Sequence, residues 1–233
     1  MDCISNLAVD RVSSIIVAVV KPPVELSCGT TAAFEELFRS LGEEKYQKLR
    51  FHYAEDMTED SVETVTLAIN IFNIRGPVYV KAADNGFAHS VDIGNYLSVS
   101  GVLKDRFPIE FSEHGFRPDL VDVTEKNFVS FSYDNVVSNI AHKLFVSSQF
   151  CCGGWAFLKA GDFLSAAGFL RTLLQSARSV SGGGKARSPL RIVDVVWQLM
   201  SQGHIFFGAR ISAYDDWGTR AAWMASRGRE SVE

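Results

Sequence analysis

The sequence is poor in cysteine, with four among 233 residues, and none of them stand at metal-ligand spacing. Cys3 and Cys28 are far apart and Cys151 and Cys152 are adjacent, so neither a disulfide framework nor a cysteine-based zinc site is expected. The longest apolar run near the amino terminus, Ile15–Val20, is far shorter than the roughly 20 residues that a membrane-spanning helix needs. We therefore expect reduced thiols, a cytosol-like location and no membrane insertion.

The sequence also lacks an excess of basic residues. It has 23 Lys and Arg against 27 Asp and Glu, a formal net charge of -4, whereas a strongly basic balance would by itself indicate a nucleic-acid partner. Its five histidines are scattered and no carboxylate cluster stands at ligand spacing, so we expect no metal and no cofactor. What is present is the composition of a globular core, with 47% hydrophobic residues, 17 Phe and 4 Trp.

A glycine run resembles a phosphate-binding loop at first sight. The segment 181–185 reads Ser-Gly-Gly-Gly-Lys, but a P-loop needs a hydroxyl residue after its lysine and a strand before its first glycine. Ala186 follows Lys185 here and no strand is predicted before the run. The segment is therefore expected to be a flexible linker between helices.

The segment around the adjacent cysteines resembles part of a protease active site. Residues 151–157, Cys-Cys-Gly-Gly-Trp-Ala-Phe, are similar to the nucleophile segment of papain-like cysteine proteases, but Gly154 stands where that segment has its cysteine. A different register would place Cys152 at a helix N-terminus, where the helix dipole lowers a thiol pKa, with His204 as the general base. Two buried, unreactive thiols are the simpler interpretation, and a papain-like viral protease stays open as an alternative.

Hydrophobic periodicity divides the first half of the chain into short elements. An apolar stripe at helical spacing predicts a helix over Ala32–Leu41, and alternation predicts a strand over Lys48–Tyr53. Alternation returns over Thr64–Phe72 and, with the turn before Val78–Val80, predicts a β-hairpin. Over Asp92–Leu103 the spacing is helical again.

The second half of the chain has mainly helical spacing. Helices are predicted around Val136–Leu144 and Phe163–Leu174, from Pro189 to Met200, and over Asp216–Ala225. The predicted fold class is α+β, with a mixed helix and hairpin N-terminal lobe, a mainly α-helical C-terminal lobe and an arm at each end. The expected segments are an N-terminal arm over 1–29, an N-terminal lobe over 30–118, a C-terminal lobe over 119–203 and a C-terminal arm over 204–233.

Basic residues from distant parts of the sequence could line one groove. Such a groove follows a phosphate backbone without reading its sequence, and nearby tyrosines would stack on bases. The alternative is that these residues are ordinary surface cations. The candidate RNA-binding residues are Arg50, Arg75, Lys81, Lys104 and Arg106.

The order of these pieces resembles the nucleocapsid proteins of orthobunyaviruses and their peribunyavirus relatives. The stretch Lys-Leu-Arg-Phe-His-Tyr at 48–53 is similar to the family's hydrophobic-Arg-hydrophobic strand. Ser-Gly-Val-Leu at 100–103 is similar to its Ser-Gly-x-Leu helix, and Phe-Val-Ser-Phe at 128–131 to its aromatic-x-Ser-Phe strand. After the predicted hairpin, this chain has Asp-Asn-Gly-Phe at 84–87 in place of the family's Pro- and Asn-rich loop.

The resemblance implies a viral nucleocapsid protein that coats single-stranded genomic RNA without sequence specificity. It implies an RNA groove between two lobes, terminal arms that dock on neighbouring copies, and a viral polymerase as a further partner, in the virion and the host cytoplasm. No catalytic residue follows from it, so the chain would not be an enzyme. Besides the protease, a capsid or scaffold protein with no nucleic-acid role stays open as an alternative.

Overall fold

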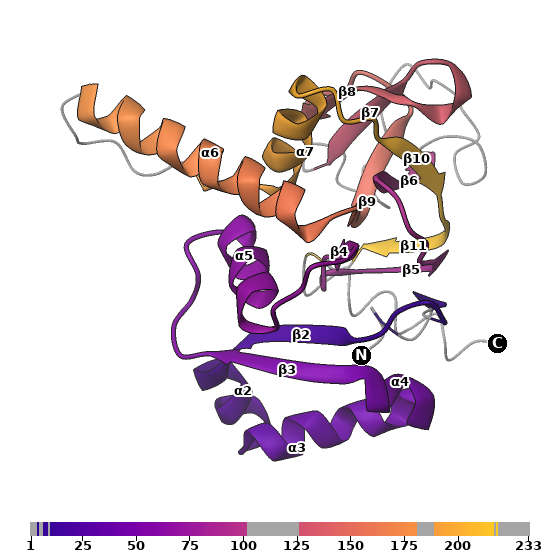
Figure 1. Cartoon of the computed structure of the whole chain (residues 1–233). Helices are drawn as coiled ribbons and strands as arrows, with labels where there is room; N and C mark the ends of the chain where they lie inside the picture. The colour runs from indigo at the N-terminus through magenta and orange to yellow at the C-terminus, as the bar shows by residue number, and fades with distance from the viewer. Residues whose placement is uncertain are drawn as a thin grey trace, which may run out of the picture.

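The N-terminal part of the chain is a two-stranded parallel sheet with short helices beside it (Figure 1). The computed structural model describes residues 4, 7–8, 10–101, 126–180, 189–216 and 218. Strands β2 (Ile15–Val20) and β3 (Leu49–Ala54) pair in parallel over six residues each. The segment between them forms α2 (Lys21–Cys28), α3 (Thr31–Glu36), the 3-10 helix η1 (Leu37–Leu41) and α4 (Glu43–Lys48).

The predicted helix over 32–41 and the predicted strand over 48–53 are confirmed, the former as α3 followed by η1. Thr30 caps α3, because its hydroxyl oxygen accepts a hydrogen bond from the N–H of Ala33 at 3.0 Å. The apolar stripe then packs Phe34 and Phe38 edge-to-face against Phe51 of β3. Helix and strand therefore bury a shared aromatic cluster.

Helix α5 (Ser61–Ile71) stands where alternation predicted the first strand of a hairpin, so that prediction is wrong. Asp60 caps the helix, since its carboxylate accepts a hydrogen bond from the N–H of Glu63 at 2.8 Å. Val62 and Ile69 lie two turns apart and are buried in the main core. An apolar run this short fits both the helical spacing and the alternation of a strand. Packing against two other helices decides in favour of the helix.

A six-stranded mixed sheet forms the centre of the molecule. Its order is β10-β6-β9-β7-β8, and β4 pairs with β9 beside the end of β7. Neighbours are antiparallel except for β10 and β6, which are parallel. The strands are β4 (Val78–Lys81), β6 (Tyr96–Gly101), β7 (Asn127–Phe131), β8 (Val137–His142), β9 (Gln149–Phe157) and β10 (Phe207–Arg210).

Helices cover one face of this sheet. Helix α6 (Ala160–Val180) and helix α7 (Ile192–Ser201) pack with α5 over the largest apolar cluster, and α6 extends beyond the body of the molecule (Figure 1). Both helices were expected from the periodicity around 163–174 and 189–200 and both are confirmed, although α7 begins at Ile192 and not at Pro189.

The other face carries a small sheet in the order β1-β5-β11. Its strands are β1 (Leu7–Ala8), β5 (Asn85–Ser90) and β11 (Ser212–Asp216). Phe87 of β5 is fully buried against Phe150 and Cys152 of β9. The central sheet is therefore enclosed between a helical layer and a β layer.

The predicted α+β class, with a mainly helical C-terminal lobe and two arms, is wrong. The segments 92–103 and 136–144, expected to be helical, contain β6 and β8. Strand β6 is buried over Tyr96–Val99, and a strand buried on both faces loses the alternation that would reveal it, whereas β8 is an edge strand with exposed positions. The expected arms are parts of sheets, because β2 pairs with β3 and β10 with β6.

The remaining expectations concern residues that this structure does not describe. The glycine linker at 181–184, the boundary at 118/119 and residues 219–225 of the expected terminal helix lie outside the described residues, while Asp216 ends β11. The division into four segments stays a prediction. Within the described ranges, no helix combines the length and the apolarity that crossing a membrane requires.

Candidate functional site

The cations proposed to bind RNA lie on different elements. Arg50 is on β3, where its guanidinium donates to two backbone carbonyl oxygens at 3.1 and 2.7 Å. Arg75 is exposed in the turn before β4 and Lys81 is the last residue of β4, so the strand separates them. Lys104 and Arg106 lie outside the described residues. Phosphate neutralisation by these five side chains stays a prediction.

The cysteine and histidine of the protease alternative are not brought together. Cys152 belongs to β9 rather than to a helix N-terminus, and burial raises the pKa of its thiol well above the ordinary value. His204 follows α7 on the helical side, with its Nδ1 3.9 Å from a carboxylate oxygen of Asp162, whereas Cys152 packs on the β5 side. A thiol held neutral and away from the base is no nucleophile, and the protease alternative is wrong.

Strand β9 changes its neighbour near Gly153. One edge pairs with β6 along most of its length, while the other pairs first with β7 and then with β4. The register with β6 shifts between Ser98 and Val99, so Cys152 and Gly153 form a β-bulge. Gly153 has a φ of +81°, a conformation that favours glycine. Such bulges bend the strand and change the direction of nearby side chains, and they are frequent next to functional sites.

Residues 81–85, which we call the β4 corner, pack onto this bulge. The N–H of Ala82 donates to the carbonyl oxygen of Gly153 at 2.7 Å. The ammonium of Lys81 donates to the carbonyl oxygens of Ala82 and Asn85, both at 2.7 Å, and to the side-chain oxygen of Asn85. The Asn85 Nδ2 donates to a carboxylate oxygen of Asp84 at 3.1 Å. The corner is therefore held by backbone and side-chain hydrogen bonds together.

Strand β11 brings two further acidic residues to the β4 corner. Its antiparallel register with β5 places Asp216 opposite Asn85 and Asp215 opposite Gly86. Among the side chains that the structure describes, which exclude those of Asp215 and Asp216, no group of three His, Cys, Asp or Glu is close enough to hold a metal. With Asp84, the backbone register nevertheless brings acidic residues from two distant parts of the chain to one corner, and Asp215 and Asp216, as successive strand residues, belong to opposite faces of the small sheet.

The β4 corner offers oxygen atoms, which are the hard donors that Mg²⁺ and Mn²⁺ prefer. The carbonyl oxygens of Ala82 and Asn85 and the side-chain oxygen of Asn85 already accept from the ammonium of Lys81. A cation at this corner would therefore depend on its acidic side chains.

The sheet face beside the corner carries hydroxyl groups. The hydroxyl oxygens of Tyr79 and Ser98 are 2.9 Å apart and lie over Gly154, where a Cβ would collide with both. The ring of Tyr79 stacks on that of Tyr96 with 5.9 Å between centroids. Burial raises the pKa of both tyrosines, so both stay neutral at physiological pH. Ser98 and Gly154 are buried, so these two hydroxyls bond each other inside the protein.

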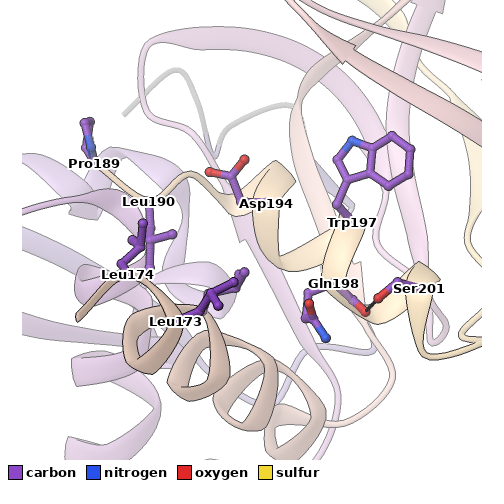
Figure 2. Close-up of a pocket in the computed structure, with 9 residues that line it drawn as sticks. Leu173, Leu174, Pro189, Leu190, Asp194, Trp197, Gln198 and Ser201 are labelled. Carbon is purple, nitrogen blue, oxygen red and sulfur yellow. Dashed lines mark hydrogen bonds between the residues drawn. The ribbon is translucent and has the colours of Figure 1, made fainter. Parts of the chain in front are cut away.

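A groove of about 450 Å³ lies between α6 and α7 (Figure 2). Leu173, Leu174, Leu190 and Trp197 contribute its apolar lining. Asp194 contributes the carboxylate of the lining. It forms an ion pair with the guanidinium of Arg191, the N-cap of α7, at 2.8 Å. The groove belongs to the helical side of the sheet, and the described residues that line it include no cation for a phosphate, so we place the functional site at the β4 corner.

Solved structures define the class of fold. No protein-family model and no curated protein sequence matches the chain. The chain is similar to a nucleoside-diphosphate-sugar pyrophosphorylase from Vibrio cholerae RC9, with a TM-score of 0.66 and 16% identity over 93% of this chain and 81% of that one. A putative glucose-1-phosphate thymidylyltransferase from Bacillus anthracis, in complex with a sucrose, has a TM-score of 0.59 and 14% identity over 96% of this chain and 78% of that one.

A third structure extends the likeness to another transferase. The inositol-1-phosphate CTP transferase from T. maritima has a TM-score of 0.57 and 12% identity over 91% of this chain and 72% of that one. The chain therefore has a nucleotidyltransferase-like fold, the one found in sugar pyrophosphorylases.

This fold overturns the resemblance to orthobunyavirus nucleocapsid proteins. The predictions of RNA coating, of assembly through terminal arms and of a viral polymerase partner are wrong, and so is the scaffold alternative. The prediction that the chain is not an enzyme is overturned too, because the structures that share its fold are described as pyrophosphorylases and transferases. The matching stretches were four to six residues long, and alternating apolar residues recur in any half-buried strand.

Sequence reasoning missed the β4 corner although signals for it were present. Asp84 and Asn85 closely follow a predicted strand, and ligands in α/β sheets bind outside the carboxyl ends of strands. Two adjacent aspartates stand at 215–216, and two adjacent glycines stand at 153–154. None of these indicates a site alone, because only the pairing of β5 with β11 and of β4 with β9 joins them.

Proposed function

We propose that the chain binds a nucleoside triphosphate or a nucleotide-sugar at the β4 corner and transfers a nucleotidyl group to or from a sugar phosphate. The observation that carries the proposal is the pairing of β5 with β11, which sets Asp216 opposite Asn85 and so brings acidic residues from two distant parts of the chain, at 84 and at 215–216, to one corner. Fold alone does not define an activity, so the corner carries the argument and the pyrophosphorylase-like fold supports it.

The chemistry of nucleotidyl transfer explains why acidic residues belong at such a site. An oxygen of the acceptor phosphate attacks the α-phosphorus of the nucleotide, the bond to the bridging oxygen breaks, and pyrophosphate leaves. Both reactants are polyanions, so the reaction needs positive charge where they meet. A divalent cation held by Asp84 and one of the two β11 aspartates, Asp215 or Asp216, would supply that charge when bound.

The junction between β2 and α2 offers no substitute for such a cation. A helix that follows a parallel strand often binds phosphate through the free N–H groups of its first turn. Pro22 and Pro23 occupy that turn of α2 and have no N–H. These two positions therefore offer no N–H to a phosphate, and the ammonium of Lys21, the first residue of α2, is paired with Glu55.

We also propose a cytoplasmic location. Nucleoside triphosphates are present there, and the buried thiols Cys151 and Cys152 would stay reduced. A virion location was predicted only from the resemblance to nucleocapsid proteins, and it is withdrawn with that hypothesis.

Calorimetric titration of the full chain with CTP, UTP, dTTP, ATP and GTP in the presence of Mg²⁺ tests the binding step. Pyrophosphate release on adding a panel of sugar 1-phosphates then tests the transfer step. We expect at least one nucleotide to bind in a Mg²⁺-dependent manner and to react with one sugar phosphate. Failure of every nucleotide and nucleotide-sugar to bind would contradict the proposal.

Asp84→Asn removes the carboxylate charge at the corner while keeping the shape of the side chain. We expect kcat/KM and Mg²⁺-dependent nucleotide affinity to fall by about 100-fold, because a cation ligand is lost. Asp134→Asn is the matched control, since Asp134 is exposed in the turn before β8 and its φ of 60° is one that Asn tolerates. The control should stay within about twofold, and equal losses in both variants would point to net charge alone.

A further inference from the structure

Helices α6 and α7 expose large apolar side chains to solvent. Phe169 and Leu173 follow each other at i, i+4 spacing on α6 and are 51% and 54% exposed. Trp197 of α7 is 41% exposed and lines the groove between the two helices together with Leu173 (Figure 2). We call these three side chains and the groove the α6–α7 face. Contiguous exposed apolar surface of this kind marks a contact site.

The charged and aromatic polar groups of the α6–α7 face are bonded within the chain. The carboxylate of Asp194 forms an ion pair with the guanidinium of Arg191 at 2.8 Å. The indole N–H of Trp197 donates to the carbonyl oxygen of Ile140 at 2.9 Å. Groups that already have protein partners lose few hydrogen bonds to water when another molecule covers them.

The hydroxyl groups along the two helices are bonded in the same way. Thr172 donates to the carbonyl oxygen of Gly168 and Ser176 to that of Thr172, both at 3.0 Å. On α7, Ser201 donates to the carbonyl oxygen of Gln198 at 2.7 Å. The polar groups beside the exposed apolar row can therefore be buried at little cost.

Helix α6 is longer than the body of the molecule that supports it (Figure 1). Its 21 residues correspond to about 31 Å, whereas the 10 residues of α7 correspond to about 15 Å. Most of the stability of a helix in a protein comes from packing its apolar face, because short isolated helices are marginal in water. The exposed row of Phe169 and Leu173 therefore favours a further packing partner.

We propose that the α6–α7 face is the interface of a homodimer, in which the faces of two copies pack on each other around a two-fold axis. Such an interface has to be complementary to itself. The charge among the described residues that line the groove is that of Asp194, and Arg191 neutralises it, so two copies do not repel each other. This interface is separate from the terminal segments and does not depend on the proposed function.

Other occupants fit the α6–α7 face less well. A helical surface that binds membranes carries lysine and arginine around its apolar side, whereas the described residues that line this groove include no cation. A partner attracted by charge would need an unpaired charge on the face, and that of Asp194 is already paired. A neutral, apolar copy of the same face meets both conditions.

The size of the α6–α7 face agrees with a reversible dimer. With widths of about 10 Å, helices about 31 and 15 Å long offer roughly 450 Å² per copy in projection. Accessible area exceeds projected area, so two copies would together bury about 1,000 Å² or somewhat more, which is near the lower limit of specific interfaces. We therefore expect a dimer that dissociates at micromolar concentrations.

Sedimentation velocity of the full chain between about 1 and 200 µM tests the proposal. The wild type should pass from monomer to dimer over this range. Leu173→Asp places a charge in the interface and should raise the dissociation constant by about tenfold or more, and Phe169→Asp should act in the same direction. Leu26→Asp is the matched control, because Leu26 is 90% exposed on helix α2 and lies outside the α6–α7 face. The control should stay within about twofold of the wild type.

Leu173→Gln keeps a good helix former at this position and replaces Leu173→Asp if circular dichroism shows that the aspartate variant does not fold. A wild type that stays monomeric throughout would overturn the proposal, and so would one that carries a lipid or another protein on the α6–α7 face in place of a second copy. Dimers that persist in the Leu173 and Phe169 variants, or that are lost equally in Leu26→Asp, would overturn it as well.

Discussion

At the scale of single residues, the glycines at 153 and 154 let other groups approach β9 more closely than any side chain would allow. Gly153 receives the β4 corner and Gly154 lies under the hydroxyls of Tyr79 and Ser98. Both halves of the candidate site therefore depend on the absence of a Cβ at adjacent positions. Gly153 combines this contact with a positive φ, so its replacement has two separate costs.

Gly153→Ala should lower the free energy of unfolding by about 2 kcal/mol or more, from backbone strain and a collision with Ala82 and Asn85. Gly168→Ala is the control, because Gly168 is exposed on α6 with no atom near its missing Cβ, and this change should add about 0.5–1 kcal/mol. Urea unfolding measures both. Equal stability of the two variants would contradict the packing at the bulge.

At the scale of elements, Asp60 joins three helices. Its carboxylate caps α5 and accepts from the guanidinium of Arg171 on α6 at 3.0 Å and from the N–H of Leu190, ahead of α7, at 3.2 Å. The side chain is 1% exposed, so these bonds are formed away from water. The three helices that cover the sheet are thereby tied together at one carboxylate.

Asp60→Ala should destabilise the protein by about 3–5 kcal/mol, since it leaves the guanidinium and two N–H groups without their acceptor. Thr30→Ala removes only the exposed cap of α3 and should cost about 1 kcal/mol. Chemical denaturation of both variants gives the comparison. A loss at Asp60 no larger than that at Thr30 would show that the contacts with Arg171 and Leu190 contribute little.

Elements with a strong local signal were predictable, and those that depend on partners were not. Helix α6 and helix α7 carry long apolar stripes, and α3 has its cap, so local physics defines them. The run that became α5 satisfied a strand pattern equally well, and Asp60 together with burial of Val62 and Ile69 decided the outcome. Such ambiguity is inherent in short apolar segments.

At the scale of the whole molecule, Cys151 of strand β9 is buried in the largest apolar cluster, between the central sheet and the helical layer. Burial raises the pKa of this thiol from an ordinary 9.0 to about 11. In the unfolded chain the thiol ionises first, so its contribution to stability is fully present below pH 9.0 and is lost as the pH rises towards 11.

The pH dependence of unfolding should therefore differ between the wild type and Cys151→Ala. The wild type should lose up to about 2–3 kcal/mol more than the variant between about pH 8 and pH 11, because the variant has no thiol to ionise. Urea titrations at the two pH values measure this difference. Tyr79 and Tyr96 also have raised pKa values but are common to both proteins, so they cancel. Parallel pH profiles would contradict the burial of Cys151.

The sequence by itself determined the local elements and several exclusions. Periodicity predicted α3, β3, α6 and α7, and the residue after Lys185 in the glycine run excluded a P-loop motif. These conclusions hold because they depend on neighbours within a few residues, whose geometry is fixed by the backbone.

Only the tertiary structure decided where the candidate site lies. The β4 corner needs Gly153 beside Ala82 and Asp216 opposite Asn85, and strand pairing between distant segments creates both contacts. Strand order and register are set by burial of the whole sheet between two layers, which no local pattern encodes. For the same reason, the cations and short motifs that suggested RNA binding are present in the sequence but led to a wrong prediction of its fold.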